Sequence, residues 1–236
     1  MNPLKDIMGL FLPRVCAMCG KPLPESLEFL CTNCRWEMPL TGFGSRFDNP
    51  VIERLHGMLP LVNASSYLWF ADGGNVRAMI HAFKYRGNWR YAYEAGKWYG
   101  SELKNGGLYG DVDVVVPVPL HFKKLLRRGY NQAEYIARGM ASVMGVLVDS
   151  RSVVRSRYNR SQTERSKSER WENVEGIFAV KHPSNLAGMH ILLVDDVLTT
   201  GATIISCART ILDTVPNCRL SIATLAVSRA EFGDFK

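Results

Sequence analysis

A run of four aliphatic residues followed by two carboxylates, Ile191-Leu192-Leu193-Val194-Asp195-Asp196, constrains the fold of this chain more than any other feature. Four consecutive aliphatics are typical of a strand buried on both faces of a parallel sheet. A turn rich in Thr and Gly, Thr199 to Gly201, follows, and residues 202–213 are predicted to form a helix. A buried strand that leads through a turn into a helix is the unit from which α/β proteins are built. The sequence therefore predicts that fold class.

The rest of the chain repeats this alternation. Asp113 to Pro119 is a short apolar run stopped by prolines, and apolar residues at helical spacing mark the helix around Ala133 to Ala141. We predict strands at 59–70, 113–119, 152–155, 191–194 and 219–227, and further helices at 74–85 and 88–104. Residues 156–171 are polar and basic, so we expect an exposed loop there. Strands that alternate with helices favour a mostly parallel sheet flanked by helices.

The turn after the acidic pair suits a phosphorylated sugar. The carboxyl end of a parallel strand faces the ligand crevice of such folds. Free backbone N–H groups at a helix N-terminus bind phosphate, glycine permits close approach, and threonine hydroxyls add donors. The candidate phosphate-binding residues are Thr199, Thr200, Gly201, Ala202 and Thr203. Asp195 and Asp196 repel phosphate, and they suit the hydroxyl donors of a ribose instead. The competing interpretation is an ordinary strand–turn–helix with surface carboxylates.

This stretch resembles the signature with which type I phosphoribosyltransferases bind 5-phosphoribosyl diphosphate (PRPP). The resemblance implies a second loop, for the diphosphate, after the first core strand at Pro117, Val118 and Pro119. A diphosphate requires cations and usually Mg²⁺. The segment that follows, residues 121–132, is strongly basic.

Four of the six cysteines lie close together near the N-terminus. Cys16-x-x-Cys19 and Cys31-x-x-Cys34 form two short knuckles, a spacing typical of a tetrahedral Zn²⁺ site. Four thiolates leave no open position for water, so we expect a structural metal. The alternative is four unrelated buried thiols. Clustered cysteines favour metal over disulfides in a reducing cytosol.

Charge is concentrated in one segment. The net charge is +7, and residues 121–170 hold 12 Lys or Arg against 4 Asp or Glu, so the whole excess lies there. Such a segment has an anionic partner or a solvated face.

The chain has no apolar run of about 18 residues, so we expect no membrane span. The N-terminal apolar run is broken by Lys5 and Asp6 and reads as a short amphipathic helix ending at Pro13, not as a signal peptide. We expect a cytoplasmic protein.

Several motifs together give a resemblance over nearly the whole chain. They are the cysteine quartet, Lys84-Tyr85-Arg86-Gly87, Pro117-Val118-Pro119, Arg127-Arg128-Gly129-Tyr130-Asn131-Gln132, Gln162-Thr163 with Arg165, Arg170 and Asn173, Gly176-Ile177-Phe178, and the acidic pair. With these residues the sequence resembles the ComF/GntX family of competence-associated phosphoribosyltransferase-like proteins. The resemblance implies a type I phosphoribosyltransferase fold behind a zinc ribbon. It also implies a role in bacterial DNA uptake or use of DNA, beside a helicase-like partner.

Two basic motifs, the loop with Arg165 and Arg170 and the motif Lys84 to Gly87, each allow more than one interpretation. In related enzymes a flexible loop closes over PRPP, which makes Arg165 and Arg170 candidate catalytic residues. The same loop equally fits a solvated basic segment or a contact to the phosphates of single-stranded DNA. Lys84 to Gly87 equally fit a second anion contact or an electrostatic cap of the preceding helix.

We therefore divide the chain into an N-terminal helix with a zinc ribbon, residues 1–42, and a phosphoribosyltransferase-like domain, residues 43–236. The first functional hypothesis is an enzyme of phosphoribosyl transfer that uses PRPP and Mg²⁺, with Asp195 and Asp196 on the ribose hydroxyls and an unknown acceptor. The alternative is a non-catalytic module of the DNA-uptake machinery that binds phosphate or nucleic acid. A third hypothesis is regulation, with PRPP as a signal.

Overall fold

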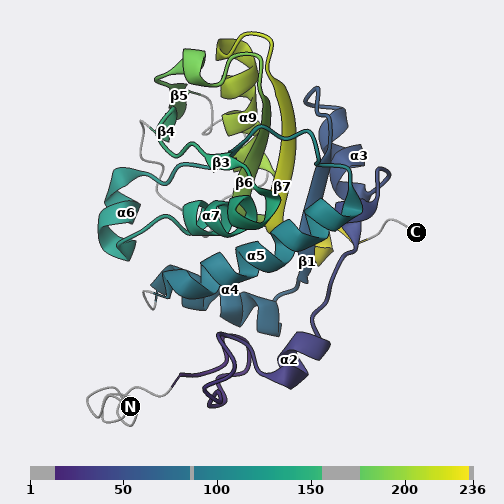
Figure 1. Cartoon of the computed structure of the whole chain (residues 1–236), viewed down its shortest axis with the longest axis vertical. Coiled ribbons are helices and arrows are strands. Elements are labelled where there is room, and N and C mark those ends of the chain that lie inside the picture. The colour runs from purple at the N-terminus through teal and green to yellow at the C-terminus, as the bar shows by residue number, and fades with distance from the viewer. Residues whose placement is uncertain (1–13, 86–87, 156–175, 234–236) are drawn as a thin grey trace.

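The computed structural model describes residues 14–85, 88–155 and 176–233. At its centre lies a five-stranded sheet with the order β1-β7-β6-β2-β3, in which every neighbouring pair is parallel (Figure 1). The strands are β1 (Ala64–Phe70), β2 (Val114–Pro117), β3 (Leu147–Val148), β6 (His190–Leu198) and β7 (Arg219–Ser228). The predicted parallel sheet is therefore confirmed, although β1 begins five residues later than the strand composition from Leu59 suggested.

Helices cover both faces of the sheet. The helices of the described residues are α2 (Thr32–Trp36), α3 (Pro50–His56), α4 (Asn75–Tyr85), α5 (Trp89–Gly106), α6 (Phe122–Arg128), α7 (Gln132–Met144), α9 (Ala202–Thr214) and α10 (Arg229–Phe232), with short 3₁₀ turns η1 (Phe43–Ser45) and η2 (Pro183–Asn185); α2 belongs to the cysteine-rich segment. Alternate residues of β6 face opposite layers. Leu192 and Val194 join the core with α4, α5 and α7, while Ile191 and Leu193 join the core with α3 and α9. This two-sided burial explains the unbroken aliphatic run.

Helices α5 and α7 pack unusually closely because glycines lie at their contact. A Cβ added to Gly139 of α7 would lie 2.1 Å from the carbonyl oxygen of Tyr93, and one added to Gly96 of α5 would lie 2.2 Å from that of Ile136. The backbones of the two helices touch at these points. This contact fixes α7, whose N-terminal end borders the functional site.

A separate two-stranded antiparallel sheet lies beyond β3, formed by β4 (Val153–Arg155) and β5 (Phe178–Val180). The strand predicted at 152–155 is therefore present, but it belongs to this hairpin and not to the parallel sheet. The predicted exposed loop at 156–171 lies outside the described residues, as does the N-terminal helix predicted to end at Pro13. No helix in the described part of the chain is long and apolar enough to cross a membrane.

The cysteine-rich segment lies against α4 and α5 (Figure 1). The ring of Phe29 lies 4.7 Å from that of Trp98, centre to centre, in the same core as α5. The chain then runs along the outer edge of β1, where Trp69 donates to the carbonyl of Pro39 (2.8 Å) and Thr41 donates to that of Tyr67 (3.0 Å). The segment thus covers a sheet edge that would otherwise expose unpaired backbone groups.

Candidate functional site

The sheet topology brings two loops together. From β2 the chain crosses to β3 on one side, and it later returns to form β6 on the other side of β2. Ligands of open α/β sheets bind at such a point of reversal, outside the carboxyl ends of the strands. Pro117 at the end of β2 pairs with Val194, and Val118 donates to the carbonyl of Val194 (2.8 Å). The loop after β2 therefore lies beside the acidic pair of β6.

A cavity of about 430 Å³ opens at this place. Its lining combines the acidic pair, the phosphate-loop candidates, the loop after β2 and several cations. The lining residues are Lys84, Val118, Pro119, Leu120, Lys124, Arg128, Asn131, Gln132, Ala133, Arg155, Asp195, Asp196, Val197, Leu198, Thr199, Thr200, Gly201, Ala202, Thr203 and Ile204. Of the predicted binding residues that the structure describes, Pro117 is outside this lining, because it is buried as the last residue of β2. Arg165 and Arg170 lie outside the described residues.

One end of the cavity is the start of α9. Gly201 caps this helix with φ of 85°, a left-handed conformation that favours glycine, and an added Cβ would lie 3.0 Å from Cδ1 of Ile205. The first backbone N–H groups of a helix have no partner within it. Together with Thr199, Thr200 and Thr203, they give this end a set of hydrogen-bond donors suited to a phosphate.

The two carboxylates differ in their surroundings. Strand β6 continues through both, so their side chains point to opposite sides of the strand. The backbone N–H of Asp196 donates to Oδ1 of Asp195 (2.8 Å), and burial together with the charge of Asp196 raises the pKa of Asp195 to about 7. The second carboxylate instead forms an ion pair, in which Oδ2 of Asp196 lies 2.8 Å from Nζ of Lys84.

Three further cations line the cavity, namely Lys124 and Arg128 of α6 and Arg155 of β4. Burial and the neighbouring Arg155 lower the pKa of Lys124, since both disfavour its charged form. The Nε atom of Arg155 is buried and makes no hydrogen bond to the described residues. Three cations in the lining of one cavity indicate a site for an anion.

The loop after β2 offers few backbone donors of its own. The N–H of Val118 is already used by the carbonyl of Val194, and Pro119 has none. The loop is held in place from α7, because the side-chain amide of Asn131 donates to the carbonyl of Val118 (3.0 Å). An anion beside this loop must therefore be bound mainly by side chains.

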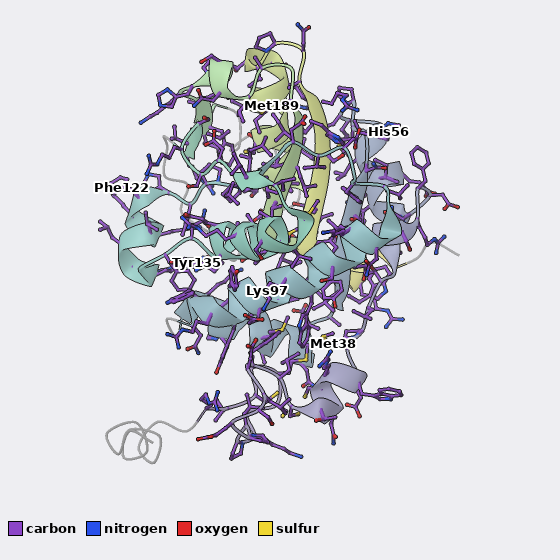
Figure 2. The ribbon with its side chains drawn as sticks, in the orientation of Figure 1. Met38, His56, Lys97, Phe122, Tyr135 and Met189 are labelled. Carbon is purple, nitrogen blue, oxygen red and sulfur yellow. The ribbon has the colours of Figure 1, made fainter. Side chains whose placement is uncertain are left out.

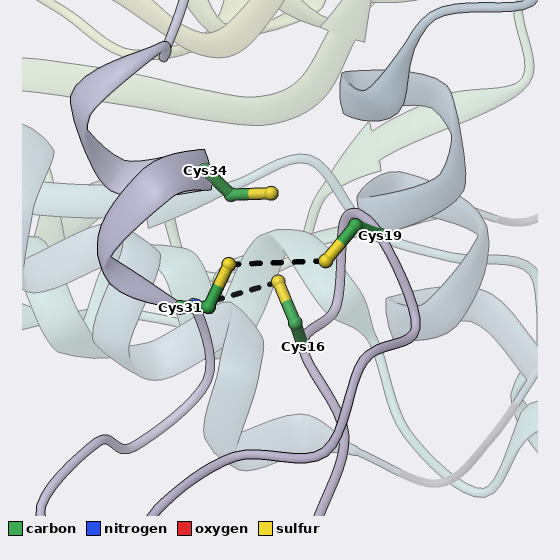
Figure 3. Close-up of side chains that lie close together, drawn as sticks. All are labelled: Cys16, Cys19, Cys31 and Cys34. Carbon is green, nitrogen blue, oxygen red and sulfur yellow. Dashed lines mark hydrogen bonds between the residues drawn. The ribbon is translucent and has the colours of Figure 1, made fainter.

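The four N-terminal cysteines converge (Figure 3). Their Sγ atoms all lie within 4.8 Å of one another, with Cys16 and Cys19 in one turn and Cys31 and Cys34 at the start of α2. The Sγ atoms of Cys19 and Cys31 are 3.8 Å apart, which matches the edge of a tetrahedron with metal–sulfur bonds of about 2.3 Å. Although burial opposes it, hydrogen bonds from the backbone of Cys19, Cys31 and Met18 lower the pKa of Cys16 to about 7. The geometry and chemistry of these residues fit a metal ion such as zinc.

At the opposite end of the sheet, a serine, a histidine and a carboxylate are joined by a chain of hydrogen bonds. Nε2 of His190 lies 2.8 Å from Oγ of Ser221, and its Nδ1 lies 3.0 Å from Oδ1 of Asp111. The side chains of His190 and Ser221 have no exposed surface, so no substrate reaches them. This group satisfies buried polar atoms and is structural.

Comparison with known proteins agrees with this site. Residues 125–232 match the family described as phosphoribosyl transferase domain. These residues are similar to a phosphoribosyl transferase domain. They contain α7, β6 and α9, while Lys84 and the cysteine quartet lie before them in the chain.

Curated relatives extend the similarity. Competence protein ComFC of Bacillus subtilis is 28% identical over 226 residues, which cover 95% of this chain and 80% of that protein. DNA utilization protein YhgH of Salmonella typhi is 34% identical over 100 residues, which cover 42% of this chain and 43% of that protein. The chain is a homologue of both, and the match to YhgH spans less than half of that protein's length.

Solved structures that match part of the chain include glutamine PRPP amidotransferase from B. subtilis and adenine phosphoribosyltransferase. The first has a TM-score of 0.37 and 20% identity, over 55% of this chain and 26% of that one. The second has a TM-score of 0.38 and 15% identity, over 63% of this chain and 75% of that one. The predicted fold class, a type I phosphoribosyltransferase fold with four clustered N-terminal cysteines, is confirmed by the domain match, the parallel sheet and the cysteine geometry.

Proposed function

We propose that this protein binds PRPP, with its Mg²⁺, in the cavity at the carboxyl ends of β2 and β6, and serves the uptake or use of DNA. The observation that carries the binding proposal is that three kinds of chemical group line one cavity. Helix N-terminal amides and threonine hydroxyls suit a 5′-phosphate, two carboxylates suit ribose hydroxyls, and a group of cations suits a diphosphate. PRPP carries all three of these parts.

The carboxylates have a definite task in this proposal. Asp195 and Asp196 accept hydrogen bonds from the ribose O2 and O3 hydroxyls, as the signature that they resemble implies. Thr199, Thr200, Gly201, Ala202 and Thr203 bind the 5′-phosphate, and the loop of Pro117, Val118 and Pro119 borders the diphosphate. Mg²⁺ is a hard cation that prefers phosphate oxygens, and it offsets the charge of the diphosphate.

If the protein is an enzyme, the bond between ribose C1 and the diphosphate oxygen breaks, and the diphosphate leaves with the electron pair. A nucleophilic acceptor forms the new bond at C1. The cations that line the cavity favour an enzyme, because cations stabilise a departing diphosphate. The scarcity of backbone donors in that loop favours the alternative, a binding module without turnover.

The proposed role in DNA metabolism rests on sequence similarity to the curated relatives. Relatives with the names competence protein ComFC and DNA utilization protein YhgH support a function in handling DNA. A helicase-like partner and single-stranded DNA remain part of the proposal, and the basic face of α6 is the surface that we expect either one to approach. We place this role in the cytoplasm, where clustered thiols stay reduced.

We also propose that Cys16, Cys19, Cys31 and Cys34 bind a structural Zn²⁺.

Isothermal titration of PRPP with Mg²⁺ tests the pocket. We expect saturable binding by the wild type and its loss in the Asp195→Asn/Asp196→Asn variant. Asp213→Asn is the matched control, since Asp213 is an exposed carboxylate of α9 outside the cavity. A wild-type protein that does not bind PRPP while folded and zinc-loaded rejects the proposal. Release of diphosphate in an acceptor screen separates the enzyme from the binding module.

A further inference from the structure

Lysine 84 lies in the cavity although it comes from α4, which precedes the matched domain. Its Nζ lies 2.8 Å from Oδ2 of Asp196, and the two side chains are 25% and 16% exposed. The same carboxylate is the one that the proposed function gives to a ribose hydroxyl. A lysine and a ligand hydroxyl therefore compete for one partner.

The position of Lys84 is fixed from two directions. Helix α4 is anchored in the core through Met79, Ile80 and Phe83. The hydroxyl of Tyr130, which follows the basic helix α6, donates to the backbone carbonyl of Phe83, the residue before Lys84. The end of α4 and the motif that contains Tyr130 thus meet at the edge of the cavity, and this contact holds Lys84 there.

The anionic end of the ligand lacks donors from the backbone. Near the end of β2 the N–H of Val118 is already bonded, and Pro119 has no N–H. Side-chain cations must supply the rest. Lys124, Arg128 and Arg155 already line that part of the cavity, and Lys84 is the cation that ligand binding would release from Asp196.

A lysine that loses its carboxylate in a partly buried site needs another anion. The ammonium is a flexible point charge on a four-carbon stem, so it can reach a nearby oxygen without movement of the helix. We propose that Lys84 leaves Asp196 when PRPP binds and contacts the diphosphate, so that a segment before the matched residues 125–232 completes the diphosphate site. This inference rests on the proposed function of the same cavity.

The test compares two ligands that differ in the diphosphate. PRPP with Mg²⁺ and ribose 5-phosphate are titrated into the wild type, Lys84→Met and Lys84→Arg. Methionine keeps the length of the stem and removes the charge, and arginine restores a charge. Lys123→Met is the matched control, because Lys123 belongs to the neighbouring basic helix but does not line the cavity.

We expect Lys84→Met to weaken PRPP binding by about tenfold to a hundredfold, the range of one charge-assisted hydrogen bond. Affinity for ribose 5-phosphate should stay the same or rise, since Asp196 is then free in the unliganded protein. Lys84→Arg should recover part of the PRPP affinity, and Lys123→Met should change neither ligand.

Two results overturn the inference alone. An equal loss for both ligands means that Lys84 only holds Asp196 in place, and unchanged affinities with a lower melting temperature mean that it only stabilises the end of α4. In both cases the wild type still binds PRPP, so the proposed function survives. A wild type that binds no PRPP rejects the proposed function, and the inference falls with it.

Discussion

The pKa of Asp195 gives a prediction whose sign and size follow from the structure. Burial and the charge of Asp196 raise this pKa from the ordinary value of 3.8 to about 7. Between these two values the native state binds one proton more than the unfolded state. The free energy of unfolding therefore falls as the pH rises from about 4 to about 7, and this loss is complete above the native pKa.

The Asp195→Asn variant removes this titration. Each pKa unit corresponds to 1.36 kcal/mol, so the full penalty of the ionised carboxyl is at most about 4 kcal/mol, and the part lost between pH 5 and pH 8 is about 3 kcal/mol. At pH 5 the wild-type carboxyl is largely neutral and resembles the amide. At pH 8 the variant should be more stable than the wild type by that additional amount.

Denaturation by urea at pH 5 and at pH 8 measures this difference. The variant's advantage should grow with pH, and a parallel thermal melt should show the gap widen by about 5–10 °C. Asp213→Asn, an exposed change on α9, should show no such growth. An advantage that is equal at both pH values, or one that shrinks as the pH rises, refutes the raised pKa of this carboxylate.

Three further predictions concern other parts of the fold. Gly139→Ala should lower the stability by more than about 2 kcal/mol in chemical denaturation, since its Cβ would lie 2.1 Å from the carbonyl of Tyr93; a neutral change would mean that α5 and α7 are not in backbone contact. His190→Ala should cost about 1–3 kcal/mol because it removes one of the two hydrogen bonds of the buried Ser221 hydroxyl, which keeps only the one from the N–H of Asn63, and a melt within error of the wild type would contradict the hydrogen bond of 2.8 Å. Cys34→Ser should lower the zinc content from one equivalent, measured by mass spectrometry, and make the protein sensitive to chelators; a zinc content that does not change would show that the metal is bound elsewhere or that Cys34 is not a ligand.

The parts of the fold that were predicted best from the sequence are those where burial or backbone conformation restricts neighbouring residues to a recognisable pattern. Strand β6 is buried on both faces, so it appears as an unbroken aliphatic run, and Gly201 marks the start of α9 because that position needs a positive φ. The tetrad of cysteines was equally clear, because metal ligands must recur at short spacing. These features depend on neighbours in the chain.

Helix α6 was not predicted, for a physical reason. None of its residues is buried, and its apolar side chains Phe122 and Leu126 are 58% and 79% exposed, so the segment carries no buried stripe that would mark a helix. Figure 2 shows Phe122 at the outer edge of the molecule. The segment was recognised only by its charge, and charge does not determine secondary structure.

The functional pairing of Lys84 was also left open, because it depends on contacts between distant segments. At the end of α4 a lysine is as expected for a helix cap as for a ligand contact, and only the position of Asp196 distinguishes the two. Arg155 was predicted to end a strand, which is confirmed, but its place in the lining of the cavity was not predicted. Tertiary contacts of this kind leave no local pattern in a sequence.

A crystal structure with PRPP and Mg²⁺ bound would test the proposed site most directly. We expect the 5′-phosphate at the amides of residues 200–203, the ribose hydroxyls on Asp195 and Asp196, and the diphosphate among Lys84, Lys124 and Arg155. Density for PRPP elsewhere on the molecule, or a phosphate in this cavity with its ribose turned away from the two carboxylates, would contradict the proposed function.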